Sequence, residues 1–176
     1  LRSFGIKQVC PMCRAELPPG PDKLFEEATR QYFEVKRMVD RGETSWSSLT
    51  KAQKTKMRIV IEKWRSAADQ RHAEAQFALG MAYDNGHGVK KDQTEAVRWY
   101  RKAADQGQVS SQYYLGVMYE HGKGVKEDHV EAVRWYRKAA DQGDASAQYN
   151  LGVNYDHGRG VKQDYAEAVR LYRMAA

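Results

Sequence analysis

Proline and cysteine are almost confined to the beginning of this chain of 176 residues. All four prolines lie at or before Pro21, and the only two cysteines are Cys10 and Cys13. The residues beyond them have no helix-breaking proline and cannot form disulfides with one another, which excludes a disulfide-stapled secreted domain. No apolar run approaches the roughly 18 residues that a membrane-spanning helix needs, and no signal-peptide pattern is visible. We therefore expect a cytoplasmic or otherwise intracellular setting, with no membrane partner.

The chain does contain a repeat with a fixed step of 36 residues. The step carries Leu79-Gly80 onto Leu115-Gly116 and Leu151-Gly152, and it carries Tyr83, the Gly86-x-Gly88-Val89 turn and Ala103-Ala104 onto their own later copies. A period of this length is typical of stacked supersecondary units, none of which can bury its apolar face alone.

Each regular unit is predicted to form a helix, a glycine turn and a second helix. In the first copy Leu79 and Tyr83 lie on one helical face, Gly80 leaves space for a close neighbour, and Gly86 is expected to end the helix in a left-handed conformation. The second helix opens with Asp92 as N-cap, and an apolar face follows at Ala96, Trp99, Tyr100, Ala103 and Ala104. No strand pattern interrupts the repeats. The region 71–176 is therefore predicted to be all-α.

The residues before the repeats divide into three parts: 1–16, a proline-rich linker at 17–21, and a divergent helical hairpin at 22–70. Asp22 is expected to cap the first helix of this hairpin, which should end at Gly42. Thr50 and Gln53 form a capping-box pattern that starts the second helix. That helix ends in Ala67-Ala68-Asp69-Gln70, one step before the same string at residue 103, so the hairpin is expected to cap the N-terminal end of the stack.

The repeated string A-x-A-Q-x-x-L-G-x-x-Y, followed by G-x-G-V and E-A-V-R-W-Y-R-K-A-A, runs from Ala73 to Gly107 and recurs in the later copies. It resembles the Sel-one-like repeat family, a relative of the tetratricopeptide repeats. The resemblance implies a right-handed α/α superhelical solenoid that serves as a protein-protein interaction scaffold, with partner proteins or peptides bound in its concave groove.

A shorter motif, Cys10-Pro11-Met12-Cys13-Arg14, places two thiolates close enough to share one zinc ion. The motif resembles the last two zinc ligands of a RING finger, with Pro11 and Arg14 in the positions that contact a ubiquitin-conjugating enzyme and the transferred ubiquitin. A RING needs eight ligands, and the others are expected upstream of Leu1. The resemblance therefore implies zinc in the intact parent protein and none in this chain by itself.

Comparison of the three copies separates constant from variable positions. Residues 74, 78 and 82 and their copies change, although they share one face of the first helix of each unit. In tetratricopeptide-like stacks this helix lines the concave groove, so we expect Tyr114, Met118, Asn150 and Asn154 to contact a partner. The alternative, drift on an unused solvent face, stays open.

The net charge of +6 is spread along the helices, where late arginines and lysines complement the helix dipole, and no nucleic-acid partner is expected. The glycine turns follow helices and recur as structural joints, unlike a phosphate-binding loop. Three functions remain: the partner-binding arm of a RING-type ubiquitin ligase, a free-standing adaptor, and a β-lactamase-like hydrolase of the kind attached to some bacterial proteins of this family. The lack of cysteines in the repeats argues against the hydrolase.

Overall fold

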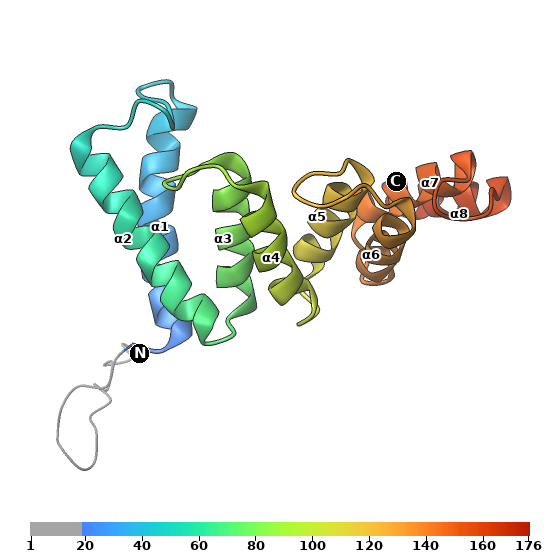
Figure 1. Ribbon diagram of the computed structural model, residues 1–176, viewed down its shortest axis with the longest axis horizontal. Helices are drawn as coiled ribbons and strands as arrows, with labels where there is room; N and C mark the ends of the chain where they lie inside the picture. Colours follow the sequence, from blue (N-terminus) through green and yellow to red (C-terminus); the bar gives the residue numbers. More distant parts are fainter. Residues whose placement is uncertain (1–18) are drawn as a thin grey trace, which may run out of the picture.

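The computed structural model describes residues 19–176, and Figure 1 shows them as a row of eight helices. Their bounds are α1 Pro21–Asp40, α2 Lys51–Asp69, α3 Ala73–Asn85, α4 Gln93–Ala104, α5 Val109–Glu120, α6 His129–Asp141, α7 Ala145–His157 and α8 Tyr165–Ala175. Consecutive helices pair as the hairpins α1–α2, α3–α4, α5–α6 and α7–α8, and no strand occurs in residues 19–176. The prediction of an all-α solenoid is confirmed.

The first hairpin follows the sequence prediction except at its start. The helix α1 begins at Pro21 with Gly20 as N-cap, so the predicted cap, Asp22, lies in the first turn instead. Proline is favoured at the first helical position because its fixed φ suits the helix and the N–H that it lacks would be unpaired there anyway. The helix α2 begins as predicted, since Thr50 and Gln53 form a reciprocal capping box.

Within the repeats, the two helices of a hairpin approach closely where a glycine faces a tyrosine. A Cβ atom on Gly80 would lie 2.5 Å from the ring of Tyr100, and one on Gly116 would lie 2.5 Å from the ring of Tyr136. Any side chain at these glycines would push the tyrosine ring or the whole helix away. The close approach predicted at Gly80 is thus confirmed, and Gly86 ends α3 in the left-handed conformation, as expected.

Successive hairpins are joined by contacts that recur with the repeat. At each joint an arginine of one hairpin donates to a tyrosine hydroxyl of the next, in the pairs Arg65–Tyr83 (2.6 Å), Arg101–Tyr119 and Arg137–Tyr155 (2.7 Å). A glutamine also donates to a carbonyl oxygen near the end of the preceding hairpin, in the pairs Gln76–Ala68 (2.9 Å), Gln112–Ala104 (3.2 Å) and Gln148–Ala140 (3.2 Å). Because Arg65 and Ala68 belong to α2, the divergent hairpin stacks in register with the repeats.

The second glycine of each glycine turn lets one repeat rest on the previous one. Gly124 has a φ of +69°, and a Cβ atom there would overlap the backbone of Gln93 at the start of α4. Gly160 lies in the same way against His129 at the start of α6. The turns therefore act as structural joints, as the sequence pattern indicates.

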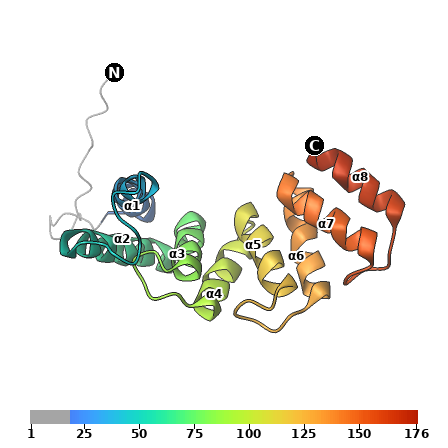
Figure 2. The same cartoon turned by 90° about the horizontal axis from the view of Figure 1, so that it is seen from above.

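Figure 2 shows the row bent into an arc, with α1, α3 and α5 on its inner side and α2 and α4 on its outer side. We call α1, α3, α5 and α7 the inner helices and α2, α4, α6 and α8 the outer helices. Each outer helix packs against its hairpin partner, and α2, α4 and α6 also pack against the inner helix that follows, so the apolar core continues from one hairpin to the next. Among residues 19–176, no helix has the length and apolar character needed to cross a membrane.

Candidate protein-binding groove

The inner helices leave hollows between them because successive hairpins touch mainly through an outer helix and the inner helix that follows it. The variable position of the repeats lies at these hollows. Ala78, Tyr114 and Asn150 occupy equivalent sites, all three are half-buried, and each faces a different junction between inner helices. The inner face thus combines a constant backbone frame with side chains that differ from one junction to the next.

The junction between α1 and α3 holds a hollow of about 330 Å³, which we call the N-terminal hollow. Its walls are mostly aromatic and aliphatic: Phe25, Tyr32, Phe33, Trp64, Phe77, Ala78 and Met81. Lys36 and Glu74 add one charge of each sign to the lining. Its volume and apolar walls are those of a small binding pocket.

His87 closes one side of the N-terminal hollow. Its ring stacks on Trp46 at a centroid distance of 4.0 Å, and its Nδ1 lies 3.1 Å from the hydroxyl of Tyr32. Burial, followed by the nearby charge of Lys36, lowers the pKa of His87, so the neutral imidazole is favoured. The longer loop of the first hairpin, which carries Trp46, therefore helps to shape this wall.

The corresponding space between α3 and α5 is filled by Tyr114. Its ring stacks on Tyr100 with the centroids 5.5 Å apart and the planes 13° from parallel, and it also contacts Phe77. One repeat step earlier, Trp64 stands in the position of Tyr100 and Ala78 in the position of Tyr114. The N-terminal hollow is open because an alanine side chain does not reach across the junction.

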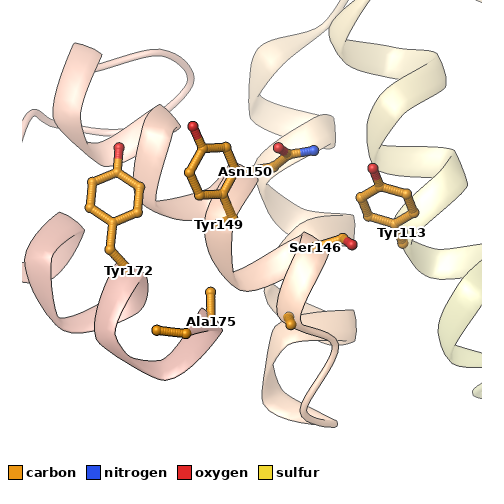
Figure 3. A pocket seen from close by; sticks show the side chains of 8 residues that line it. Tyr113, Ser146, Tyr149, Asn150, Tyr172 and Ala175 are labelled. Atoms are coloured by element: carbon orange, nitrogen blue, oxygen red, sulfur yellow. The ribbon is translucent and has the colours of Figure 1, made fainter.

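A second, wider hollow of about 700 Å³ runs along α7, from Tyr113 of α5 to Tyr172 of α8. We call it the C-terminal hollow. Figure 3 shows that the hydroxyl groups of Tyr113, Tyr149 and Tyr172 point to the same side, with the amide of Asn150 between Tyr149 and Tyr113. The predicted residue Asn150 therefore lies among aromatic side chains on the inner face.

Met118 and Asn154 do not line the groove, and the expectation that their side chains contact a partner there is wrong. Their exposed fractions are 1% and 0%. The reason is geometric: an α-helix advances 100° per residue, so each step of four residues turns the stripe by about 40°. Two such steps rotate the third position away from the inner surface and into the joint with the preceding hairpin.

Asn154 instead belongs to a polar cluster around Glu120. Its Nδ2 atom donates to Glu120 Oε1 over 3.3 Å and to the carbonyl oxygen of Asn150 over 2.8 Å. The hydroxyl of Tyr136 donates to Glu120 Oε2 over 2.7 Å. Burial and then the neighbouring Glu120 raise the pKa of Tyr136, so the phenol stays protonated as a donor.

Sequence reasoning missed the residues that make the two hollows most distinctive. It did not single out Ala78, although alanine is the smallest residue at a position occupied later by tyrosine and asparagine. It also passed over Phe77, Tyr113 and Tyr149. An aromatic residue stands at this position in every copy, and the comparison of copies selected only the positions that vary. The structure brings Tyr113 and Tyr149 together with Asn150.

Cys10, Pro11, Cys13 and Arg14 lie outside the described residues, as does the whole segment 1–16. The predicted zinc ligands and the predicted contacts with ubiquitin-conjugating enzyme and ubiquitin therefore stay predictions. In the part of the chain that the structure describes, no three His, Cys, Asp or Glu side chains come together in a way that could hold a metal ion.

Comparisons with known proteins agree with this architecture. The model of the Sel1 repeat matches residues 73–108, 109–144 and 145–176. A search of curated proteins finds no match. Among solved structures, the chain is similar to c5321, a protective antigen of uropathogenic Escherichia coli strains that displays an SLR fold, with 36% identity and a TM-score of 0.70 over 90% of this chain and 33% of that one.

Two further structures extend the comparison. A Sel1 repeat protein from Oxalobacter formigenes is 33% identical, with a TM-score of 0.68 over 89% of this chain and 57% of that one. Helicobacter pylori cysteine rich protein B, at 24% identity and a TM-score of 0.55 over 69% of this chain and 87% of that one, shares the fold. The chain thus spans a third of the first relative's length and just over half of the second's.

The matched share of about nine tenths exceeds the three repeat segments, so the likeness to the first two structures includes part of the divergent N-terminal hairpin. Three matching repeats in a row cover more than half of the chain and coincide with the hairpins α3–α4, α5–α6 and α7–α8. The chain belongs to the Sel1 repeat family.

Proposed function

We propose that this chain is a protein-interaction scaffold that holds an extended segment of a partner protein along its inner face. Stacked Sel1 repeats form an α-solenoid, the architecture of protein-interaction scaffolds. The observation that carries the proposal is the N-terminal hollow, which offers apolar walls in the groove between α1 and α3. One bulky apolar side chain of the partner occupies this hollow as an anchor, in the way that grooves commonly bind peptides.

Two features of the N-terminal hollow support the anchor. Phe33 is half exposed at 50%, and the partly exposed Phe77 also lines the hollow, so apolar area remains for a ligand to cover. The wall formed by Tyr32 and His87 is held by their mutual hydrogen bond and by stacking on Trp46, so little ordering is needed on binding.

The test uses peptides selected from a random library displayed on phage, with the whole chain as bait. Ala78→Tyr fills the N-terminal hollow as Tyr114 fills the next junction, and the new ring can stack on Trp64. We expect this variant to weaken binding of the selected peptides by at least about tenfold, since a buried apolar anchor contributes about 1.5–3 kcal/mol. Fluorescence anisotropy with labelled peptide gives the dissociation constants.

Ala78→Ser is the matched control, because it changes the same position and leaves the hollow open; it should bind within about twofold of the unmodified protein. Circular dichroism checks that both variants fold. Equal affinity of Ala78→Tyr and Ala78→Ser for every selected peptide would reject an anchor in this hollow.

A more specific role rests on the Cys10-Pro11-Met12-Cys13-Arg14 sequence. We propose that the solenoid is the partner-binding arm of a RING-type ubiquitin ligase, with resemblance of this motif as its sole support. The test uses the natural protein, including whatever residues precede Leu1 in it. Cys13→Ser should lower its zinc content and stop ubiquitin transfer from a ubiquitin-conjugating enzyme, whereas Ala78→Tyr should impair only partner capture. A natural protein without zinc would instead favour the free-standing adaptor.

A further inference from the structure

Charge is divided between the inner and outer helices of the three repeats. The inner helices α3, α5 and α7 contain no lysine or arginine, and their acids are Glu74, Asp84, Glu120 and Asp156. The outer helices α4, α6 and α8 carry the bases Arg98, Arg101, Lys102, Arg134, Arg137, Lys138, Arg170 and Arg173. The other bases of the repeats lie in the connecting loops, such as Lys90 and Lys126. The inner helices α3, α5 and α7 are therefore acidic although the chain is basic, whereas the inner helix α1 carries bases as well as acids, among them Lys36 in the N-terminal hollow.

The aromatic residues of the C-terminal hollow lie within the field of these acids. Burial and then Asp156 raise the pKa of Tyr172, while burial, Tyr114 and then Asp144 and Glu120 raise that of Tyr113. Burial is the largest cause of each shift, and the smaller contributions of carboxylates agree with acids lying near these rings.

The same hollow offers groups that bind cations. Tyr149 is 56% exposed, and its ring centroid lies 5.5 Å from that of Tyr172. Figure 3 shows their hydroxyl groups directed to one side, with the Asn150 amide beside Tyr149. Aromatic faces attract ammonium and guanidinium groups, and phenol and amide oxygens can accept their hydrogen bonds. No lysine or arginine lines this hollow.

Glu120 accepts hydrogen bonds from Tyr136 and Asn154, and Asp84 accepts one from Gln93. Glu74 is exposed and lines the N-terminal hollow, with only a long hydrogen bond of 3.4 Å from Gln108, and Asp156 is half-buried. The inner acids most accessible to a ligand are therefore Glu74 and Asp156. They are distributed over α3 and α7, so their charges act along the length of the groove rather than at one point.

We infer that the segment bound along the inner face is a cationic peptide, in which one apolar anchor is accompanied by lysine or arginine side chains that reach the C-terminal hollow. This inference rests on the proposed function, because it names the chemistry of the partner for the same groove. Charge complementarity between a basic segment and the acidic inner helices α3, α5 and α7 selects this partner over an acidic one, which the carboxylates of these helices repel.

The test uses the peptides selected on phage and a triple variant, Glu74→Gln/Asp84→Asn/Asp156→Asn. We expect the selected sequences to carry a net positive charge, and we expect the triple variant to bind them roughly fivefold more weakly, at the scale of a few exposed ion pairs. The affinity of the unmodified protein should fall as sodium chloride is raised, and the triple variant should show a flatter dependence.

The matched control is Glu95→Gln/Glu131→Gln/Glu167→Gln, which removes the same amount of charge from the outer helices; it should bind within about twofold of the unmodified protein. Selected peptides without net positive charge, or equal weakening by the two triple variants, would overturn the inference. In that case, sensitivity to Ala78→Tyr would still uphold the groove as a binding site. Selected peptides insensitive to both Ala78→Tyr and the inner triple variant would overturn the groove and the inference together.

Discussion

The junction between α3 and α5 and the junction between α5 and α7 use the same positions one repeat apart, and they differ in chemistry. At the first, Met118 is buried and the buried hydroxyl of Tyr100 has no hydrogen-bond partner among residues 19–176. At the second, Glu120 accepts hydrogen bonds from Tyr136 and Asn154. One junction is thus packed by apolar contacts, and the other is organised by a carboxylate.

The difference comes from residues that change together. Asp84 stands where Glu120 stands in the next repeat, and its carboxylate accepts from Gln93 instead of from the tyrosine. The shorter acid, Asp84, occurs with the apolar Met118, and the longer acid, Glu120, occurs with its hydrogen-bond donor Asn154. Within each junction the residues therefore match one another. A solenoid can therefore alter one junction without changing the contacts that stack its hairpins, because repeats interact mainly with their neighbours.

The largest effect is expected when a residue of the polar junction is transferred to the apolar one. Met118→Asn places a buried amide where the equivalent acid is the shorter Asp84, which already accepts from Gln93, and it leaves a cavity, so we expect a loss of about 3 kcal/mol in the free energy of unfolding. Urea unfolding followed by circular dichroism measures it. The reverse change, Asn154→Met, takes one donor from Glu120 but also removes an amide whose Oδ1 is already unpaired, so it should cost less, about 1–2 kcal/mol. Losses below about 0.5 kcal/mol for both variants would show that the two junctions are chemically interchangeable.

A smaller effect is expected when the two tyrosine hydroxyls are removed. Tyr136→Phe takes one donor from Glu120, whose side chain is only 13% exposed, so stability should fall by about 1–3 kcal/mol. Tyr100→Phe removes a buried hydroxyl that lacks a partner in the described part of the chain and should leave stability unchanged or raise it slightly. The same unfolding measurement compares the two variants. A loss for Tyr100→Phe as large as for Tyr136→Phe would mean that the hydroxyl of Tyr100 has a partner too, such as a bound water molecule.

Much of this comparison could be predicted from the sequence because the repeat shows which residues of different copies are equivalent. The step of 36 residues by itself pairs Tyr100 with Tyr136 and Met118 with Asn154, and the glycines reveal the turns and one close approach. Local signals also decide the helix starts, as the Thr50–Gln53 capping box does. These features depend on contacts near in sequence or on strict periodicity.

The groove was less predictable because it depends on distances between helices. The stripe of steps of four residues passes over Tyr114 and Asn150, which lie at the inner face, but the rotation of the stripe buries Met118 and Asn154. The N-terminal hollow lies between α1 and α3, and no repeat step aligns α1 residue by residue with the later inner helices. Its opening depends on Ala78, whose small size becomes informative only when Tyr114 is seen to fill the same space.

The smallest effect is expected at the arginine–tyrosine pairs, which are the same at both junctions. Arg101 donates to Tyr119 and Arg137 donates to Tyr155, and both hydrogen bonds are exposed. Because exposed hydrogen bonds contribute little, Tyr119→Phe and Tyr155→Phe should each lower the free energy of unfolding by about 0.5–1 kcal/mol, and by the same amount within error. Tyr83→Phe, at the joint with the divergent hairpin, is the control for position in the stack. Clearly unequal losses for Tyr119→Phe and Tyr155→Phe in urea unfolding would show that the chemical difference between the junctions extends through the whole joint. Equal losses would confine this difference to the residues around Tyr100 and Tyr136. A change of partner specificity at those residues would then leave the stacking of the hairpins intact.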